Sequence, residues 1–321
     1  MNQPAPRRDG PRGPQSRSQG PSRGTPRGRG AAARGGARQG TRTGPAKPNA
    51  TPVSEPKPPR DQMTFDFAAI KPIAPPAWLA ERAGAMGVEF DASDVERLGV
   101  LLACIQAGNE RVNLTAITDS EQAWQRHVLD SLTLMGVLAD LPEGSRVLDI
   151  GTGAGLPGLP LAICMPHLKF TLLDGTAKKI AFVQAAAARV GVKNVEAVAG
   201  RAEQLGHDIG VRRDVMGKVI RDGGWREQFD AVVARAVGQL DTLAEMAVPF
   251  AKVGGVVALI KGAQAQQEVE AASKTLHEIK VVVNTIAATP TGQIVILEKR
   301  VATPRLYPRA ERVNAAKHKK K

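Results

Sequence analysis

Short apolar segments alternate with alanine-rich, helix-like segments between Arg146 and about residue 276. This alternation predicts a doubly wound parallel sheet of the α/β class. Two strand-like runs then close the pattern at residues 280–286 and 293–299, and a connection this short requires antiparallel pairing. The predicted strands are 146–150, 168–173, 194–198, 229–234 and 254–260, and the predicted helices lie near 157–165, 176–190, 239–251 and 264–276.

The stretch before residue 140 shows helical rather than alternating periodicity. One predicted helix carries a single apolar stripe, and a second runs from Ser120 to Leu138 with Asp119 or Ser120 as its N-cap. We therefore expect a small helical region over residues 75–140, followed by the α/β domain over residues 141–302. The stripe of the first helix consists of Val95, Leu98, Leu101, Leu102 and Ile105.

The basic residues of the chain are concentrated at its ends. The net charge is +13, and residues 1–60 supply 13 Lys and Arg against two acidic residues, leaving 31 basic and 29 acidic residues for the rest. Those sixty residues hold twelve prolines, ten glycines and no aromatic residue, so they cannot bury enough apolar surface to offset the entropy of ordering. We predict a disordered basic tail over residues 1–74 and a basic C-terminal tail over residues 303–321.

The N-terminal tail contains five Arg-Gly pairs, and segments of this kind commonly follow nucleic-acid phosphates without reading sequence. A solvated solubility tail is the alternative, and a transit peptide is disfavoured because the segment has no apolar face.

No long apolar run indicates export or a membrane span. Cys104 and Cys164 stand alone in apolar surroundings, without ligands at metal-binding spacing. We expect a cytoplasmic, metal-free protein.

A glycine-rich loop follows the first predicted strand, in the sequence VLDIGTGAGLPGLP at residues 147–160. Gly153, Gly155 and Gly158 fit the dinucleotide fingerprint G-x-G-x-x-G. Asp149 and Gly151 extend the loop to D-x-G-x-G-x-G, with which methyltransferases that use S-adenosylmethionine (SAM) open their cofactor site. The Asp149 carboxylate would repel a pyrophosphate and attract the ammonium and sulfonium of SAM. Asp149 could instead cap the loop by accepting backbone N–H bonds, and both roles can coexist.

Polar residues also follow the ends of the next predicted strands. Asp174 closes KFTLLD, where an acid can accept hydrogen bonds from both ribose hydroxyls of an adenosine. Ala202 and Glu203 come just after the third strand, and Arg235 ends the fourth. Because ligands of a doubly wound sheet lie beyond the carboxyl ends of its strands, we expect these residues to share one crevice with Gly151.

A larger set of motifs gives the chain a specific resemblance to one family. VLDIGTGAGLPGLPLAI is preceded by NLTAIT and RHVLDSL and followed by LLDGTAKKIAFV, GRAEQL, FDAVVARAV and LIKG. Together these motifs, over roughly residues 77–300, resemble the ribosomal RNA small subunit methyltransferase G family, also called RsmG or GidB. The resemblance implies a class I SAM-dependent methyltransferase fold. It also implies transfer of a methyl group from SAM to N7 of one guanine in 16S rRNA, free or in an assembling small subunit.

The same resemblance implies roles for individual residues of the crevice. Gly151 and Leu156 would contact SAM in the glycine loop, and Ala202 and Glu203 would hold its adenosine portion. Arg235 would lie between the cofactor and the target base, as the catalytic residue.

Other residues of these motifs are expected to face the RNA. His127 and Lys261, in RHVLDSL and LIKG, would contact it, although a histidine satisfied by a neighbouring residue is the alternative for His127. Gly175 departs from the family pattern, which usually has serine there. The arginine-rich segment 206–227 is longer than the usual link, and we interpret it as a loop over the target base, with a surface insertion without function as the alternative.

Methylation of guanine N7 agrees with the absence of an N-P-P-Y motif from the sequence. N7 already presents a lone pair, so its methylation requires no general base, and the chain has no N-P-P-Y motif. Arg235 could not act as a base, because its guanidinium stays protonated. Two other functions remain open. An NAD(P)-dependent oxidoreductase is supported by G-x-G-x-x-G and Asp174 but opposed by Asp149, and a noncatalytic RNA-binding protein could use the same fold.

Overall fold

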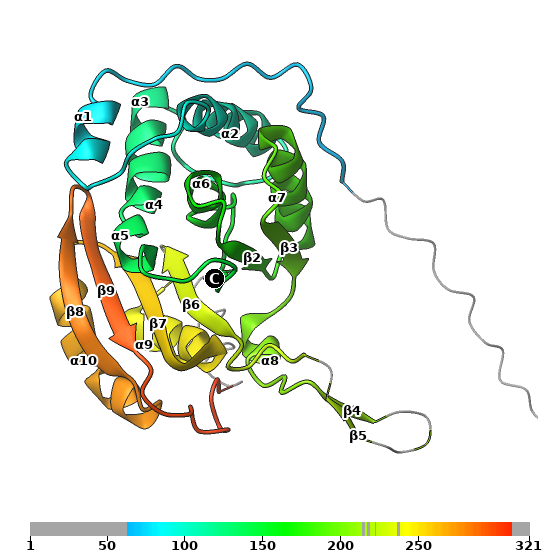
Figure 1. Ribbon diagram of the computed structural model, residues 1–321, viewed down its shortest axis with the longest axis vertical. Coiled ribbons are helices and arrows are strands. Elements are labelled where there is room, and N and C mark those ends of the chain that lie inside the picture. The colour runs from blue at the N-terminus through cyan, green and yellow to red at the C-terminus, as the bar shows by residue number, and fades with distance from the viewer. Residues whose placement is uncertain (1–62, 214–215, 217–218, 222, 236–237, 310–321) are drawn as a thin grey trace, which may run out of the picture. The chain divides into compact units, whose positions relative to one another are not determined.

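The computed structural model describes residues 63–309 except 214–215, 217–218, 222 and 236–237, and its main element is a seven-stranded sheet (Figure 1). The strands are β1 (Arg146–Ile150), β2 (Lys169–Asp174), β3 (Val195–Ala199), β6 (Phe229–Arg235), β7 (Ala251–Lys261), β8 (Val282–Thr289) and β9 (Gly292–Glu298). Their order is β3-β2-β1-β6-β7-β9-β8. The first five in this order are parallel, and β9 pairs antiparallel with both β7 and β8. The predicted parallel sheet with a terminal antiparallel hairpin is confirmed.

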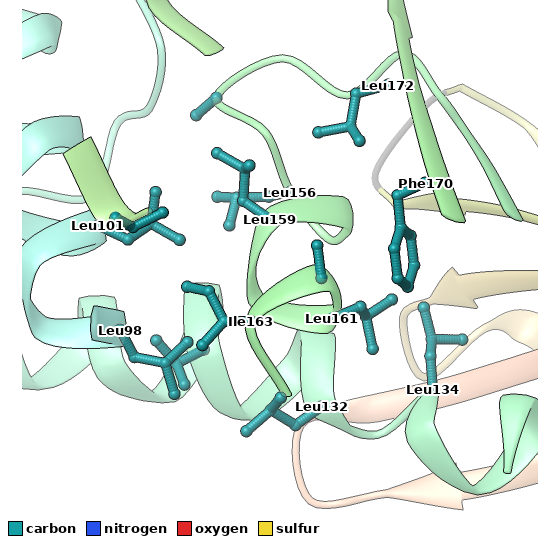
Figure 2. Packing of buried hydrophobic residues seen from close by; sticks show 14 of the residues in the cluster. Leu98, Leu101, Leu132, Leu134, Leu156, Leu159, Leu161, Ile163, Phe170 and Leu172 are labelled. Carbon is teal, nitrogen blue, oxygen red and sulfur yellow. The ribbon is translucent and has the colours of Figure 1, made fainter. Parts of the chain in front are cut away.

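Each face of the sheet contributes to a separate hydrophobic core, because successive residues of a strand point to opposite sides. In β1, Val147 belongs to one core and Leu148 to the other. The first core lies under α6 (Gly158–Cys164) and α7 (Ala177–Val190), with α2 (Asp94–Asn109) packed against both helices. The second lies under α9 (Leu240–Ala247) and α10 (Ala265–Glu278). Figure 2 shows the first core, where Leu98 and Leu101 of α2 approach Ile163 of α6.

The helical region before the sheet is less regular than its periodicity suggests. After α1 (Leu79–Gly84) and α2, the predicted helix 120–138 is divided into α3 (Ser120–Ala123), a π-helical turn (Trp124–Leu129), α4 (Asp130–Leu132) and α5 (Met135–Leu138). Asp119 is confirmed as the N-cap, since its Oδ1 accepts from the Gln122 N–H at 2.8 Å. The helix breaks at Thr133, whose hydroxyl donates to the Asp130 carbonyl at 2.5 Å, and such local bonds compete with helical ones.

The N-terminal tail was predicted to extend to residue 74, and this boundary is wrong. Residues 63–74 are among the described residues, and Phe67 is only 6% exposed. The rings of Phe65 and Phe67 meet Phe182 of α7 edge-on, with centroids 5.5 and 5.8 Å away. Arg189 of the same helix donates to the carbonyls of Phe67 and Ile70. The part of the predicted tail before residue 63 lies outside the described residues.

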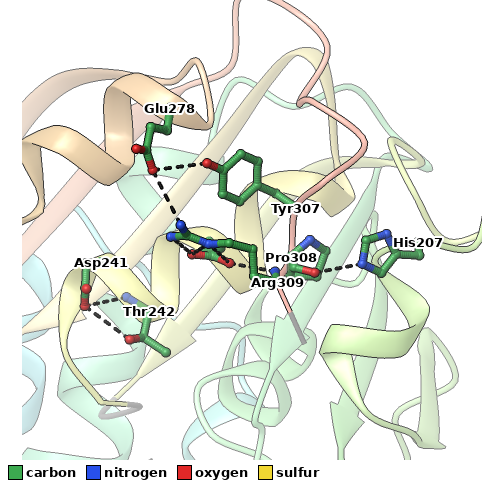
Figure 3. A network of polar contacts seen from close by, with 8 residues as sticks. His207, Asp241, Thr242, Glu278, Tyr307, Pro308 and Arg309 are labelled. Carbon is green, nitrogen blue, oxygen red and sulfur yellow. Dashed lines mark hydrogen bonds and ion pairs between the residues drawn. The ribbon is translucent and has the colours of Figure 1, made fainter. Parts of the chain in front are cut away.

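The predicted boundary of the C-terminal tail at residue 303 is wrong for a similar reason. Tyr307 is buried, and its hydroxyl donates to Glu278 of α10 at 3.1 Å (Figure 3). Arg309 forms an ion pair with Glu245 of α9 at 2.8 Å, and its backbone N–H donates to the same carboxylate at 2.6 Å. Residues 303–309 are therefore held on the second face of the sheet, and residues 310–321 lie outside the described residues.

The segment 206–227 contains a small hairpin of its own. Its strands β4 (Val211–Arg213) and β5 (Val219–Arg221) pair antiparallel with each other and not with the seven-stranded sheet. At the base of the segment the buried Arg226 guanidinium donates to the carbonyls of Gly206, Tyr307 and Thr303 at 2.6, 2.8 and 2.7 Å. Arg226 thereby joins both ends of the segment to the C-terminal residues.

We expect the Arg226→Ala variant to lower the free energy of unfolding by about 3 kcal/mol, because three buried carbonyls lose a charged donor. Urea denaturation monitored by circular dichroism measures this loss. Arg300→Ala is the matched control, since it breaks only an exposed ion pair with Glu298 and should leave the midpoint unchanged. Equal midpoints for Arg226→Ala and the wild type would show that Arg226 does not anchor the segment.

Candidate active site

The glycine loop leaves the carboxyl end of β1 and wraps around the side chain of Asp149. Its Oδ2 accepts from the Thr152 hydroxyl at 2.6 Å and from the Gly158 N–H at 3.0 Å. A Cβ on Gly158 would lie 2.9 Å from that oxygen, so glycine is required for the close approach. Asp149 therefore caps the loop, which was one of the two roles that its sequence position left open.

Asp149 retains one carboxylate oxygen that the loop does not use. The residue is fully buried, and its Oδ1 has no hydrogen-bond partner among the described residues. Burial raises the pKa of Asp149 to about 6, although the hydrogen bonds from Thr152 and Gly158 act in the opposite direction. A buried carboxylate with an unsatisfied oxygen favours a cationic or hydrogen-bonding neighbour over an anionic one.

Three glycines of the loop adopt conformations that other residues rarely take. Gly151, Gly153 and Gly155 have φ of +70°, +57° and +81°. A Cβ on Gly153 would have only the Gly151 carbonyl oxygen within 4 Å, at 3.8 Å, so the space beside it is open. Leu156 differs from the expectation, because its side chain is buried in the first core (Figure 2) and leaves only its backbone for a ligand.

Asp174, at the carboxyl end of β2, is tied to the same loop. Its Oδ2 accepts from the Gly153 N–H at 3.1 Å, and its Oδ1 accepts from the Thr176 N–H at 2.8 Å. The side chain is half-buried, and a carboxylate can accept further hydrogen bonds beyond these two. The structure thus brings Asp174 and the glycine loop together as predicted from the sequence.

Beyond β3, Ala202 and Glu203 begin the short helix α8 (Ala202–Leu205), with Ala202 buried and Glu203 half-buried. The neighbouring Arg201 lies against Gly175. A Cβ on Gly175 would lie 2.8 Å from Arg201 Nη1, at the far end of an exposed side chain, so a serine there would require that guanidinium to shift.

Arg235 ends β6 and reaches toward the π-helical turn. Its Nη1 donates to the Arg126 carbonyl, and its Nη2 lies 3.5 Å from His127 Nδ1. The carboxylates of Asp130 and Asp149 interact with it electrostatically, which opposes the lowering of the Arg235 pKa by burial. The guanidinium therefore lies among the π-helical turn, α4 and the end of β1.

His127 does not face solvent, contrary to the RNA contact expected from its motif. It is 4% exposed, and its Nε2 lies 3.0 Å from the Thr115 hydroxyl. Burial and the nearby Arg235 lower the pKa of His127 to about 4, so the ring is neutral at pH 7. The alternative interpretation, a helix histidine satisfied by its neighbours, describes His127 correctly.

Lys261 is likewise unavailable for the RNA contact that we expected of it. Its ammonium forms an ion pair with Glu268 at 2.7 Å and donates to the Gly238 carbonyl at 2.8 Å, and its side chain is 6% exposed. Glu268 also accepts from the Leu240 N–H at 3.0 Å. Lys261 and Glu268 therefore hold Gly238 and the first residue of α9. The position of Lys261 in the motif LIKG did not reveal these internal partners.

Three polar residues at this site were missed by the sequence analysis. Thr152 forms a hydrogen bond with the side chain of Asp149, and Thr115 forms one with the side chain of His127. Asn109 accepts from the Leu114 and Thr115 N–H groups. Thr115 lies in the motif NLTAIT, which was quoted without a role for any of its residues. Within the described residues there is no cluster of three or more potential metal ligands, and no helix is long and apolar enough to cross a membrane.

Comparison with known proteins assigns the chain to a family. The profile of rRNA small subunit methyltransferase G matches residues 94–296. A ribosomal RNA small subunit methyltransferase G from Sorangium cellulosum is 45% identical over 251 residues, covering 78% of this chain and 99% of that protein. Its namesakes from Moorella thermoacetica and Deinococcus radiodurans are 40% and 39% identical, covering 63% and 72% of this chain and 80% and 88% of theirs. The chain belongs to the rRNA small subunit methyltransferase G family.

Proposed function

We propose that this protein transfers a methyl group from SAM to N7 of a guanine in 16S rRNA. The observation that carries the proposal is the meeting of the glycine loop, Asp149, Asp174 and Arg235 at the carboxyl ends of β1, β2 and β6. Ligands of doubly wound sheets bind at this edge. Family membership supports rRNA as the substrate, and a protein that acts on rRNA would work in the cytoplasm.

The residues of the loop fit SAM. Open space beside Gly153 lets a ligand approach the backbone, and the free Oδ1 of Asp149 suits a cation. In our proposal Gly151, Gly153, Gly155 and the Leu156 backbone form the cradle. Asp174 accepts from the ribose, and Ala202 and Glu203 border the adenine. When bound, SAM supplies an electrophilic methyl group.

The other residues of the crevice support alignment rather than proton transfer. Guanine N7 needs no base. Arg235 stays protonated, and the pKa of about 4 makes the neutral His127 imidazole a weak base. Burial raises the pKa values of both Cys104 and Cys164 to about 12, so neither supplies a thiolate nucleophile. Arg235 would hold the target base in line with the methyl group.

The activity is tested with the full-length protein, tritiated SAM, and either protein-free 16S rRNA or 30S subunits that lack the modification. We expect label in the rRNA, and strand scission by borohydride and aniline at one guanine, which marks N7 methylation. Label on an exocyclic amine or on a protein would overturn the proposal. Titration with NADH in the same buffer tests the oxidoreductase alternative, which requires saturable binding.

The basic tail allows a separate prediction, although residues 1–60 lie outside the described residues. If roughly six of its 13 Lys and Arg neutralise phosphates, raising salt from about 50 to 200 mM should cost on the order of a thousandfold in RNA affinity. Deleting residues 1–60 should remove most of that slope without changing the rate at saturating RNA. Equal slopes for both proteins, measured on one RNA fragment, would favour a solubility tail.

A further inference from the structure

A chain of hydrogen bonds leads from α2 to the guanidinium of Arg235. Asn109, the last residue of α2, accepts from the Leu114 and Thr115 N–H groups at 2.8 and 3.0 Å and thereby fixes the loop that carries Thr115. The Thr115 hydroxyl lies 3.0 Å from His127 Nε2, and His127 Nδ1 lies 3.5 Å from Arg235 Nη2. The loop and Arg235 are therefore connected through one imidazole.

We assign His127 the Nε2–H tautomer from the donors and acceptors in this chain. A guanidinium can only donate, so in the 3.5 Å contact with Arg235 Nη2 the Nδ1 atom is the acceptor. In a neutral imidazole the other nitrogen then carries the hydrogen, and Nε2–H donates to the Thr115 hydroxyl oxygen. That oxygen also accepts from the Ile117 N–H at 3.0 Å. With this assignment, the Thr115 hydroxyl oxygen is the acceptor that keeps the lone pair of His127 directed at Arg235.

The π-helical turn provides the second contact of Arg235. Single π-helical turns are rare and are found frequently at functional sites. Here the Arg126 carbonyl, inside the turn, accepts from Arg235 Nη1, and the next residue, His127, faces Nη2. The His127 carbonyl accepts from the Ser131 hydroxyl at 2.6 Å, which ties the turn to α4. Two consecutive residues of one turn therefore fix two nitrogens of the same guanidinium.

We propose that Thr115 is a positioning residue, which sets the tautomer of His127 and through it the orientation of Arg235 toward the target guanine. This inference rests on the proposed function only for its kinetic test. Without the Thr115 hydroxyl, Nε2–H has no acceptor, and the ring can take the Nδ1–H form or rotate. An N–H would then face the guanidinium, which would lose one of its two contacts and turn away.

The kinetic test compares Thr115→Val with Thr115→Ser, which keeps the hydroxyl. We expect the valine variant to lower the single-turnover rate on the order of tenfold, with the Kd for SAM unchanged, and the serine variant to restore most of the rate. Thr118→Val, on the same loop and exposed, is the matched control. If Thr115 acts through Arg235, valine at position 115 should have no further effect in an Arg235→Ala background.

A spectroscopic test does not depend on activity. In the ¹⁵N-histidine spectrum of the wild-type protein at pH 7, His127, assigned by loss of its signals in His127→Asn, should show an unprotonated Nδ1 and a protonated Nε2. Thr115→Val should change that pattern. A protonated Nδ1 in the wild type, or a folded valine variant with the wild-type rate, would overturn the inference. A wild-type protein that transfers no methyl group would refute the proposed function and leave the spectroscopic result standing.

Discussion

The Gly153→Val variant is expected to lose SAM affinity by on the order of a hundredfold, equivalent to about 2.7 kcal/mol, while remaining folded. Gly153 has φ of +57°, which a β-branched residue adopts only with strain. The introduced valine side chain would also project into the open space where the cofactor is proposed to approach the backbone. Isothermal titration with SAM measures the effect, and RNA binding should persist.

A matched glycine separates local blocking from general strain. Gly144, in the turn before β1, has φ of +78° and open space around its missing Cβ. It lies at the amino end of β1, whereas the glycine loop follows the carboxyl end. Gly144→Val should therefore carry similar strain and bind SAM as the wild type does. An unchanged Kd for a folded Gly153→Val protein would mean that the cofactor site is wrongly placed.

The sheet and the position of the crevice could be predicted because both follow from patterns along the chain. Apolar runs of strand length give β1, β2 and β6, and the polar residue that ends each run must lie at the same edge when the strands are parallel. Asp174 and Arg235 were found in this way, and Asp149 was found from the motif of the glycine loop. The glycine loop was equally accessible, since it directly follows a strand.

The partners of the side chains could not be predicted, because they come from residues distant in the chain. Lys261 and His127 each seemed suited to an RNA contact by charge and by motif. In the structure the Lys261 ammonium pairs with Glu268 and donates to the Gly238 carbonyl. The two ring nitrogens of His127 contact Thr115 and Arg235. No pattern of spacing distinguishes a polar residue that points outward from one that is satisfied inside.

The limits of the folded region were misplaced for a related reason. Residues 63–74 follow a proline-rich stretch and were grouped with it, although Phe65 and Phe67 supply the apolar surface that the stretch before them lacks. At the other end, Tyr307 and Arg309 pack on α9 and α10 through carboxylates of those helices. A few well-placed residues therefore extend a folded region beyond what average composition indicates.

Replacing Arg235 with alanine is expected to lower the single-turnover rate of methyl transfer on the order of a hundredfold, because the target base loses the group that aligns it. The Kd for SAM should change by no more than about threefold. A large loss of rate with a small change in Kd would identify an interaction made in the transition state. Arg235→Lys keeps the charge but not the two-pronged donor geometry, so it should recover only part of the rate.

The comparison with Arg235→Lys also distinguishes alignment from simple charge. The Arg126 carbonyl and His127 Nδ1 contact two different nitrogens of the guanidinium, and a lysine ammonium, whose donors share one nitrogen, does not reproduce this planar geometry. If Arg235 acts only through its charge, lysine should restore the full rate. Arg300 follows β9 and lies near the amino ends of the parallel strands, away from the crevice. Arg300→Ala therefore controls for the loss of a basic residue and should transfer methyl groups normally. A wild-type single-turnover rate in Arg235→Ala would remove Arg235 from the mechanism and return attention to the glycine loop.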